Sequence, residues 1–405
     1  MLAAGDAAAG NLDLVATLDN RVSGGANATQ TTASKQPRAH VPVGEGHLYL
    51  PAVTGNYASV AFPAIGSSED FVLELEVDLA DVNEMHLVSG TNTTERIIVY
   101  SSGTKFQCNL NGSAIGTLSS PLATGLSVIR CERASGTVTL KQDGSTKCTL
   151  TGVNGHANFT DISLNGNFST GVDPLSGSLK KVTLSVAGTE ELNIDFSDGD
   201  HKASTFACST GQTVTINKSG NDPATIVRRN FLRFDGSSDS LVGVFNESNT
   251  TGGYFFASFS VNGDSGESSG RIFNMKSSED AAGYNSGRAF LWSLRESMTD
   301  NLAYYWSYSF RGVHTGKFDE ANGVILHEVK AVDGNQFSKV NNADLKSTTL
   351  NLQQLSSEDF YIAQNPQGSG SPAIDLEALY LFDHTLTDDD ASKIRDYLNA
   401  KSSIY

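Results

Sequence analysis

The stretch Phe231-Leu-Arg-Phe-Asp-Gly-Ser-Ser-Asp-Ser-Leu241 predicts a strand, a Gly/Ser turn and a second strand. An earlier stretch, His47-Leu-Tyr-Leu-Pro-Ala-Val-Thr-Gly-Asn-Tyr-Ala-Ser-Val60, has the same layout. A polar segment with Gln, Thr and Asn precedes each of them and ends in a proline, at 30–37 and at 212–223. Because similarity at long range indicates a repeated architecture, we expect two copies of one fold.

Length and composition agree with two all-β domains. A chain of 405 residues exceeds one ordinary core, and only 18% of its residues are charged. Gly, Ser, Thr and Asn separate short apolar runs, which is typical of a β protein with many turns. Phe71 to Leu79 alternates apolar and polar residues, which predicts an antiparallel strand with one buried face. Asp143-Gly144 predicts a hairpin turn farther along the chain.

We divide the chain into four parts on these patterns. Residues 1–44 form a polar lead-in that is either disordered or paired along a sheet edge, and 45–198 form the first sandwich. Residues 199–228 are expected to be a connector, and 229–405 the second sandwich with one helix. Thr387 is the expected N-cap of that helix, whose apolar stripe should pack on the end of the second sandwich.

Charge and cysteine content limit the partners and the compartment. The net charge of -17 argues against nucleic acid and against an anionic membrane. Met1 to Asp6 lacks the features of a secretory signal, and no apolar run is long enough to span a membrane, so we expect synthesis in a cytoplasm. Cys131 and Cys148 are close enough in the strand pattern for a bridge, but free buried thiols are favoured for all four cysteines.

Two segments of the second half resemble a known family. The opening strand Phe234–Leu241 and the closing segment Ala378–Tyr397 resemble the start and end of concanavalin A-like (laminin G-like) jelly-roll domains. The form with a closing Leu-(Phe/Tyr)-Asp-x-x-Leu-(Thr/Ser) segment is common in virion structural proteins of tailed phages. The resemblance is good over about 229–400 and weaker over 45–198. It implies an all-β fold of two tandem antiparallel jelly-roll β-sandwiches with a short C-terminal helix.

The resemblance also implies a role and a location. It suggests a virion protein made in the host cytoplasm, either a tail adhesin or a capsid decoration protein. The expected partners are other virion structural proteins, a host-surface glycan and further copies of the chain as a homo-oligomer. No enzyme activity is expected. A purely architectural assembly protein and a polysaccharide-cleaving glycosidase are the alternatives.

The glycosidase alternative depends on Glu74, Glu76 and Asp78, which share the polar face of one predicted strand. Related jelly-roll glycosidases carry a nucleophile and an acid/base on such a strand. Their spacing is Glu-x-Asp-x-x-Glu or Glu-x-Asp-x-Glu, whereas this chain has Glu-Leu-Glu-Val-Asp. A solvated strand face is therefore the favoured interpretation.

A calcium site is the one cofactor site that the sequence leaves open. Laminin G-like domains often hold calcium at one rim, and Asp235 and Asp239 lie in the turn of the opening motif, with Asp264 and Glu267 farther along. The alternative is that these aspartates bond to their own backbone as ordinary turn residues. No cofactor is otherwise expected.

Aromatic residues of the second half form the predicted sugar platform. The candidate glycan-binding residues are Tyr304, Tyr305, Trp306, Tyr308 and Trp292. A single strand over 302–310 would place Tyr304, Trp306 and Tyr308 on one face, together with Phe310. That face is either core or an exposed surface on which sugars stack.

Overall fold

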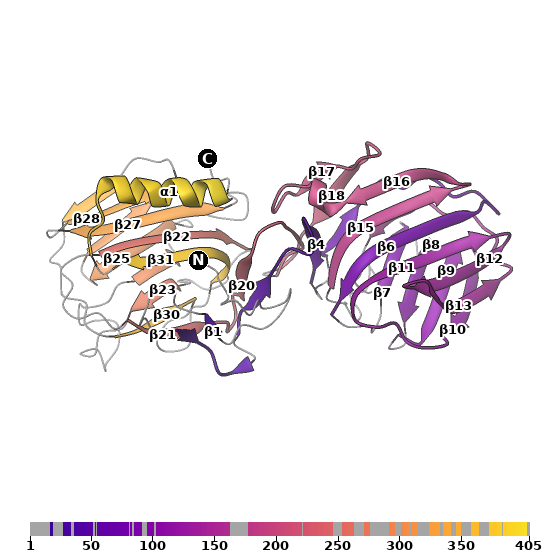
Figure 1. Ribbon diagram of the computed structural model, residues 1–405, viewed down its shortest axis with the longest axis horizontal. Helices are drawn as coiled ribbons and strands as arrows, with labels where there is room; N and C mark the ends of the chain where they lie inside the picture. Colours follow the sequence, from indigo (N-terminus) through magenta and orange to yellow (C-terminus); the bar gives the residue numbers. More distant parts are fainter. Residues whose placement is uncertain are drawn as a thin grey trace. The chain divides into compact units, whose positions relative to one another are not determined.

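The computed structural model describes residues 17–18, 27–33, 36–51, 53, 55–80, 82, 85–90, 95–100, 103–162, 177–220, 222–245, 253–262, 271–275, 291–295, 301–307, 310–314, 324–332, 335–341, 346–349, 358–363, 372–382 and 384–402. The chain divides into unit 1, Met1–Val41 with Asn230–Tyr405, and unit 2, Pro42–Arg229. Each unit is a jelly-roll sandwich of two antiparallel sheets (Figure 1). The all-β prediction is confirmed.

Sheets C and D form unit 2. Sheet C contains β13 (Ser145–Thr151), β12 (Thr137–Gln142), β11 (Gly125–Ala134), β6 (Phe71–Leu79), β15 (Gly177–Val186), β4 (His47–Leu50) and β19 (Thr225–Val227) in spatial order, with β16 (Thr189–Asp195) also paired to β15. Sheet D contains β10 (Ser113–Thr117), β9 (Lys105–Leu110), β8 (Glu95–Tyr100), β7 (Met85–Gly90), β14 (Phe159–Ile162), β5 (Tyr57–Ser59), β18 (Thr213–Asn217) and β17 (Thr205–Ala207). A short 3₁₀ helix, η2 (Phe196–Asp198), follows β16.

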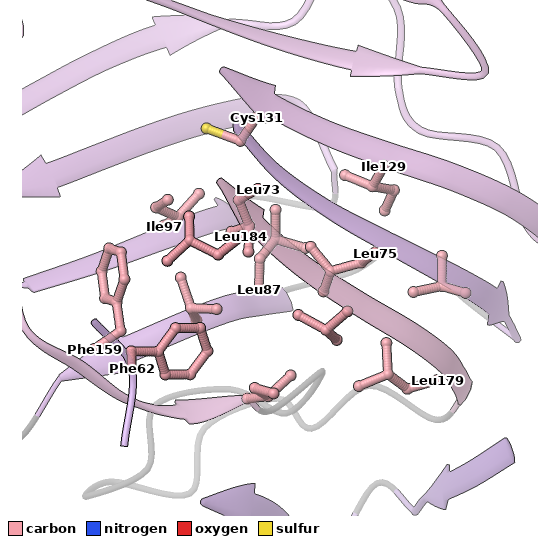
Figure 2. Close-up of a cluster of buried hydrophobic side chains, with 14 of the residues drawn as sticks. Phe62, Leu73, Leu75, Leu87, Ile97, Ile129, Cys131, Phe159, Leu179 and Leu184 are labelled. Carbon is pink, nitrogen blue, oxygen red and sulfur yellow. The ribbon is translucent and has the colours of Figure 1, made fainter. Parts of the chain in front are cut away.

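The core of unit 2 lies between these sheets. Every second residue of β6 from Phe71 to Leu79 is buried, which confirms the alternation predicted for this strand. Figure 2 shows Leu73 and Leu75 of β6 packed among side chains of both sheets, such as Leu87 and Ile97. Each fully buried leucine of this kind contributes about 1.5–3 kcal/mol through removal from water.

The predicted Asp-Gly hairpin is also confirmed. Strands β12 and β13 meet at Asp143 and Gly144, which both adopt positive φ angles of 49° and 77°. Two successive residues with positive φ form a tight turn whose twist matches that of the paired strands.

Sheets A and B form unit 1. Sheet A contains β29 (Lys346–Thr349), β28 (Asn335–Val340), β27 (Ile325–Val332), β22 (Gly253–Val261), β31 (Ala373–Phe382), β20 (Phe231–Asp235) and β3 (Arg38–His40) in spatial order. Sheet B contains β1 (Thr17–Leu18), β2 (Ala28–Thr29), β21 (Leu241–Phe245), β30 (Glu358–Ile362), β23 (Arg271–Met275), β24 (Leu291–Arg295), β25 (Asn301–Ser307) and β26 (Phe310–His314).

The two units repeat one topology, as the sequence predicts. The order β29-β28-β27-β22-β31-β20 in sheet A matches β13-β12-β11-β6-β15-β4 in sheet C, strand for strand along the chain. Strands β24 and β25 of sheet B likewise occupy the places of β8 and β9 of sheet D. The two stretches that reveal the repeat in the sequence open with the equivalent strands β20 and β4.

The helix α1 (Asp388–Ser402) lies along the outer face of sheet A (Figure 1). The predicted cap is present, because the backbone N–H of Asp390 donates to Thr387 Oγ1 at 3.1 Å. Ala391 and Leu398 pack against Tyr254, Phe256 and their neighbours. The expected position at the end of the sandwich is therefore wrong. Strand β22 is buried at all nine residues, because the core covers one face and α1 the other.

The lead-in and the connector are integral parts of the sandwiches. Strands β1 to β3 of the lead-in pair at the edges of both sheets of unit 1, whereas β17 to β19 of the expected connector pair at the edges of unit 2. Val214, Ile216 and Ile226 of the connector enter the core of unit 2. Their apolar side chains are few and widely spaced, which makes the segment resemble a linker in composition.

All four cysteines are free and buried. No helix among the described residues is long and apolar enough to cross a membrane.

Candidate functional site

A continuous row of polar residues crosses the outer face of sheet D. The row follows directly opposed positions on all eight strands: Ser113, Asn109, Arg96, Ser89, Asp161, Ser59, Thr215 and Thr205. We call this set the polar row. Its neighbours along the strands, such as Ile97, Cys108 and Val214, belong to the core. Since side chains alternate between faces, the polar row lies on the face away from the core. For Asp161 only the backbone position is described.

Side chains next to the polar row extend the same face. His86, Ile98, Gln107 and Ile115 form a second line of directly opposed residues. Gln107 Nε2 donates to Ser113 Oγ at 2.9 Å, which links the two lines. At the other end of the row, Asn217 Nδ2 donates to Ser59 Oγ at 3.1 Å.

Two atoms at the centre of the polar row have no hydrogen-bond partner among the described residues. They are Ser89 Oγ and Arg96 Nε, and both are buried. Ser89 is only 6% exposed, and it lies directly opposite Arg96 on the adjacent strand. An unpaired buried polar atom costs about 1–3 kcal/mol, so this pair is a place where the fold leaves hydrogen-bonding capacity unused.

His86 lies beside Arg96 and is held neutral. Burial first, and then the positive charge of Arg96, lower the pKa of His86 to about 4. At neutral pH this imidazole therefore has one nitrogen that donates and one that accepts. Arg96 supplies the positive charge of this part of the face.

The chemistry of the row suits a polyhydroxylated ligand. Serine and threonine hydroxyls donate and accept, an asparagine amide does both through separate atoms, and a guanidinium donates only. This mixture matches sugar hydroxyls, each of which can also donate and accept.

The carboxylates of the glycosidase alternative lie on the other sheet of unit 2. Glu74 pairs with Arg130, and Glu76 accepts from Lys180 Nζ at 2.9 Å on the outer face of sheet C. Hydrogen bonds from Lys141 and Arg130 lower the pKa of the neighbouring Glu132. Glu74 and Glu76 are thus both engaged by basic side chains, and each is about one-third exposed. The arrangement favours the solvated strand face.

The aromatic candidates lie on sheet B of unit 1. Trp292 on β24 is directly opposite Tyr304 on β25, and Tyr305 is opposite Leu291. The side chains of Trp292, Tyr304, Tyr305 and Trp306 lie outside the described residues, and so does all of Tyr308. The sugar platform therefore stays a prediction.

The prediction of a single aromatic strand over 302–310 is wrong. Strand β25 ends at Ser307, and Phe310 begins β26, which runs antiparallel beside it with Ser307 opposite Phe310. The chain thus reverses within the segment that was expected to be straight. The alternation of aromatic residues with serine continues through this reversal without Gly, Pro or Asn, and serine is the weaker of the turn residues, so the turn was not predicted.

The calcium candidates form a turn that satisfies its own carboxylates. Asp235 accepts from the backbone N–H of Ser237 at 2.8 Å and from its hydroxyl at 2.6 Å. Burial would raise the pKa of Asp235, but these bonds and others from Ser238 and Asp239 outweigh it and lower the pKa. Asp239 accepts from the backbone N–H of Asp235 at 3.0 Å.

This geometry favours the turn alternative, and calcium binding at the rim stays a prediction. Within the described part of the chain, no three His, Cys, Asp or Glu side chains are placed to share a metal ion. Asp264 and Glu267 lie outside the described residues.

Comparison with known proteins finds similarity only among solved structures. No family model matches the sequence, and no curated protein matches it. The domains LG4-5 of the mouse laminin α1 chain are 12% identical, with a TM-score of 0.32 over 84% of this chain and 89% of that chain. A putative carbohydrate binding protein from Bacteroides ovatus is 14% identical, with a TM-score of 0.34 over 46% of this chain and 61% of that chain.

The binding domain of botulinum neurotoxin serotype D is also similar, at 12% identity and a TM-score of 0.32. That similarity covers 51% of this chain and 48% of the toxin chain. At such identities and TM-scores these similarities carry no information on what this chain binds.

Sequence reasoning missed the polar row. The only signal was the alternation in Lys105-Phe-Gln-Cys-Asn-Leu110, where Gln107 and Asn109 interrupt an apolar strand. That pattern places both residues on the outer face. It contains no information on which residues of distant strands lie opposite them.

Proposed function

We propose that this protein is a non-enzymatic glycan-binding protein and that the polar row of sheet D is its binding face. The observation that carries the proposal is the pair Ser89 and Arg96, opposite each other at the centre of the row. Both present a buried polar atom without a partner among the described residues. A sugar hydroxyl or carboxylate that displaced the groups covering this pair would accept from Arg96, exchange a hydrogen bond with Ser89 and so satisfy both atoms.

The equivalent sheet of unit 1 is the second expected contact surface. Its strands β24 and β25 carry the aromatic candidates in the places that β8 and β9 hold in unit 2. Aromatic rings stack on sugar faces, whereas hydroxyls and amides form hydrogen bonds with sugar hydroxyls. One chain would thus offer two sugar-binding sheets of different character, and two weak contacts on one polymer raise its avidity.

The virion context belongs to the same proposal. It is supported by the resemblance of the segment Ala378–Tyr397 to the closing segment found in virion proteins of tailed phages. Repeated presentation on a symmetric particle would multiply weak glycan contacts. Mass spectrometry of purified particles from the parent source tests this part, because absence of the chain from the particles would remove it.

A glycan microarray tests the binding function. We expect the wild-type protein to bind surface polysaccharides or their oligosaccharide fragments, and Arg96→Met to lose most of this signal. Trp306→Ala measures the separate contribution of the aromatic strand. Binding that survives Arg96→Met and disappears with Trp306→Ala would move the site to unit 1. Release of reducing ends from a bound polysaccharide would instead support the glycosidase alternative.

A further inference from the structure

Each sandwich is completed at one edge by a short strand that follows a proline. In unit 2, β19 pairs with β4 and places Ile226 opposite Leu48. In unit 1, β3 pairs with β20 and places Ala39 opposite Leu232. All four side chains belong to the cores of their units. The two edge strands therefore have equivalent places and equivalent roles.

The edge strands come from different directions along the chain. Strands β17 to β19 directly follow the other strands of unit 2, so this unit is one continuous segment. The same places in unit 1 are filled by β1 to β3. In the sequence, the whole of unit 2 lies between these strands and the rest of unit 1, which begins at residue 230. Unit 1 is thus completed by a segment on the far side of another domain in the sequence.

Strand pairing, a ring stack and a side-chain hydrogen bond are among the contacts that hold this N-terminal segment in unit 1. Three residues of β3 pair with β20, and Thr29 of β2 pairs with Val242 of β21. His40 stacks on Phe231 with ring centroids 4.6 Å apart. Gln30 Nε2 donates to Ser240 Oγ at 2.8 Å. None of these contacts depends on whether the segment belongs to the same chain or to another copy.

Without the segment, unit 1 would expose the edge of β20 and the core residue Leu232. Unpaired sheet edges recruit strands from other chains, and natural proteins keep them covered. Exchange of an identical element between copies costs little, because the same contacts form in both arrangements. The choice between them depends on the effective concentration of the chain's own segment compared with the concentration of other copies.

We propose that residues 17–41 exchange between copies of this chain, so that β1 to β3 of one copy complete unit 1 of the next. The ligand is a second copy of the chain, bound by strand addition at the edge of β20. At low concentration the segment closes on its own unit, and at high concentration the chains link. The proposal does not depend on what the polar row binds, although linked copies would present several polar rows together.

Cysteine pairs split between two full-length chains test this exchange. One chain carries Ala39→Cys and a size tag, and the other carries Leu232→Cys. They are unfolded, mixed and refolded together at about 1 mM, on the order of the effective concentration that a short linker supplies. Directly opposite residues in antiparallel strands are close enough for a disulfide. We expect a covalent heterodimer on a non-reducing gel, which dilution before refolding prevents.

Equivalent positions in unit 2 provide the matched control. Chains with Leu48→Cys and Ile226→Cys should not cross-link to each other, because β4 and β19 belong to one continuous unit. Wild type is the blank for the four native cysteines. His40→Cys with Phe231→Cys repeats the test at a neighbouring opposed pair, in case Leu232→Cys does not fold.

The single chain with both Ala39→Cys and Leu232→Cys decides between the outcomes. If it closes its own disulfide while the split pair forms no heterodimer at either position, the segment stays in its own chain and the proposal is overturned. If neither the single chain nor the split pairs form the bond, β3 does not lie on β20 and the proposal is overturned as well.

Discussion

Arg233 and Asp375 form a two-point ion pair inside unit 1. Nε and Nη2 of the guanidinium lie 2.7 and 2.8 Å from the two carboxylate oxygens, from directly opposite positions on β20 and β31. The side chains are 2% and 0% exposed. Asn262 Nδ2 also donates to Asp375 at 2.8 Å. This polar cluster therefore ties together three segments of the sandwich whose edge the N-terminal segment completes.

Removal of one partner from this pair should destabilise unit 1 strongly. Asp375→Ala removes the carboxylate that pairs with the buried guanidinium of Arg233, and breaking a buried ion pair in this way typically costs about 3–5 kcal/mol. The double variant Arg233→Met with Asp375→Leu removes both charges and should lose much less. Urea unfolding measures both, with the two units treated as separate transitions. An equal loss in the single and double variants would contradict this account.

Stability should fall as the pH falls below about 6.5. Burial lowers the pKa of His47 to about 3, and Val43 N–H donates to its Nδ1 at 3.0 Å. The unfolded chain binds a proton at this histidine below about pH 6.5 and the folded chain does not, so protons favour unfolding. His86, whose folded pKa is about 4, acts in the same direction.

Each of these histidines should change the free energy of unfolding by about 1.4 kcal/mol per pH unit between pH 4 and 6.5. The contribution of each histidine to the free energy of unfolding is complete above this window and is lost as the pH falls through it. Urea unfolding of wild type and His47→Gln at several pH values measures the difference in slope. An identical slope in the variant would show that His47 titrates alike in both states.

The N-cap of α1 should contribute measurably to stability. Thr387→Ala removes the acceptor for Asp390 N–H and should cost about 1 kcal/mol. Hydrogen exchange of the α1 amides should report faster opening of the helix. Tyr397→Ala, at a position that is 51% exposed, is the control and should have little effect. Equal effects of the two substitutions would argue against the cap.

The ion pairs on the outer face of sheet C should contribute little. Glu76→Ala removes the partner of Lys180 at a site that is about one-third exposed, and exposed pairs contribute about 0–1 kcal/mol. We expect a small change in the urea midpoint and no change in glycan binding. A reducing-end assay on bound polysaccharide completes the test. Cleavage by wild type that is lost in Glu74→Ala or Glu76→Ala would restore the glycosidase alternative.

Much of the fold could be predicted from local pattern. The alternation from Phe71 to Leu79 and the cap at Thr387 depend only on residues close together in the sequence, and the structure confirms both. The position of α1 on a sheet face could not be predicted, because it depends on the second apolar face of β22. That strand has Tyr254 and Phe256 on the face beneath the helix, so its nearly continuous apolar run does not show which side is core.

The candidate site was harder to predict than the fold. Ser89, Arg96 and Asn109 lie on three strands, and only the register between those strands places them in line. Register depends on bulges such as the one between His86 and Val88, and no residue type at these positions predicts a bulge. The edge strands at 38–40 and 225–227 are short and follow polar segments, so the sequence does not predict their pairing with distant strands either.

The most direct test of the central claim is the dissociation constant of the best microarray glycan for wild type, Ser89→Ala, Arg96→Met and Thr139→Ala. Thr139→Ala removes a polar group from the outer face of sheet C and serves as the control. Loss of one hydrogen bond should weaken binding about 3- to 10-fold in Ser89→Ala, and loss of a charged donor about 10-fold or more in Arg96→Met.

The stability of Ser89→Ala separates a binding role from a structural one. Because Ser89 Oγ has no partner among the described residues, its removal should leave the free energy of unfolding unchanged or raise it. The account therefore predicts weaker glycan binding by an equally stable protein. Wild-type affinity in both Ser89→Ala and Arg96→Met, or a loss of stability in Ser89→Ala that matches its loss of binding, would contradict the claim that the polar row binds glycan.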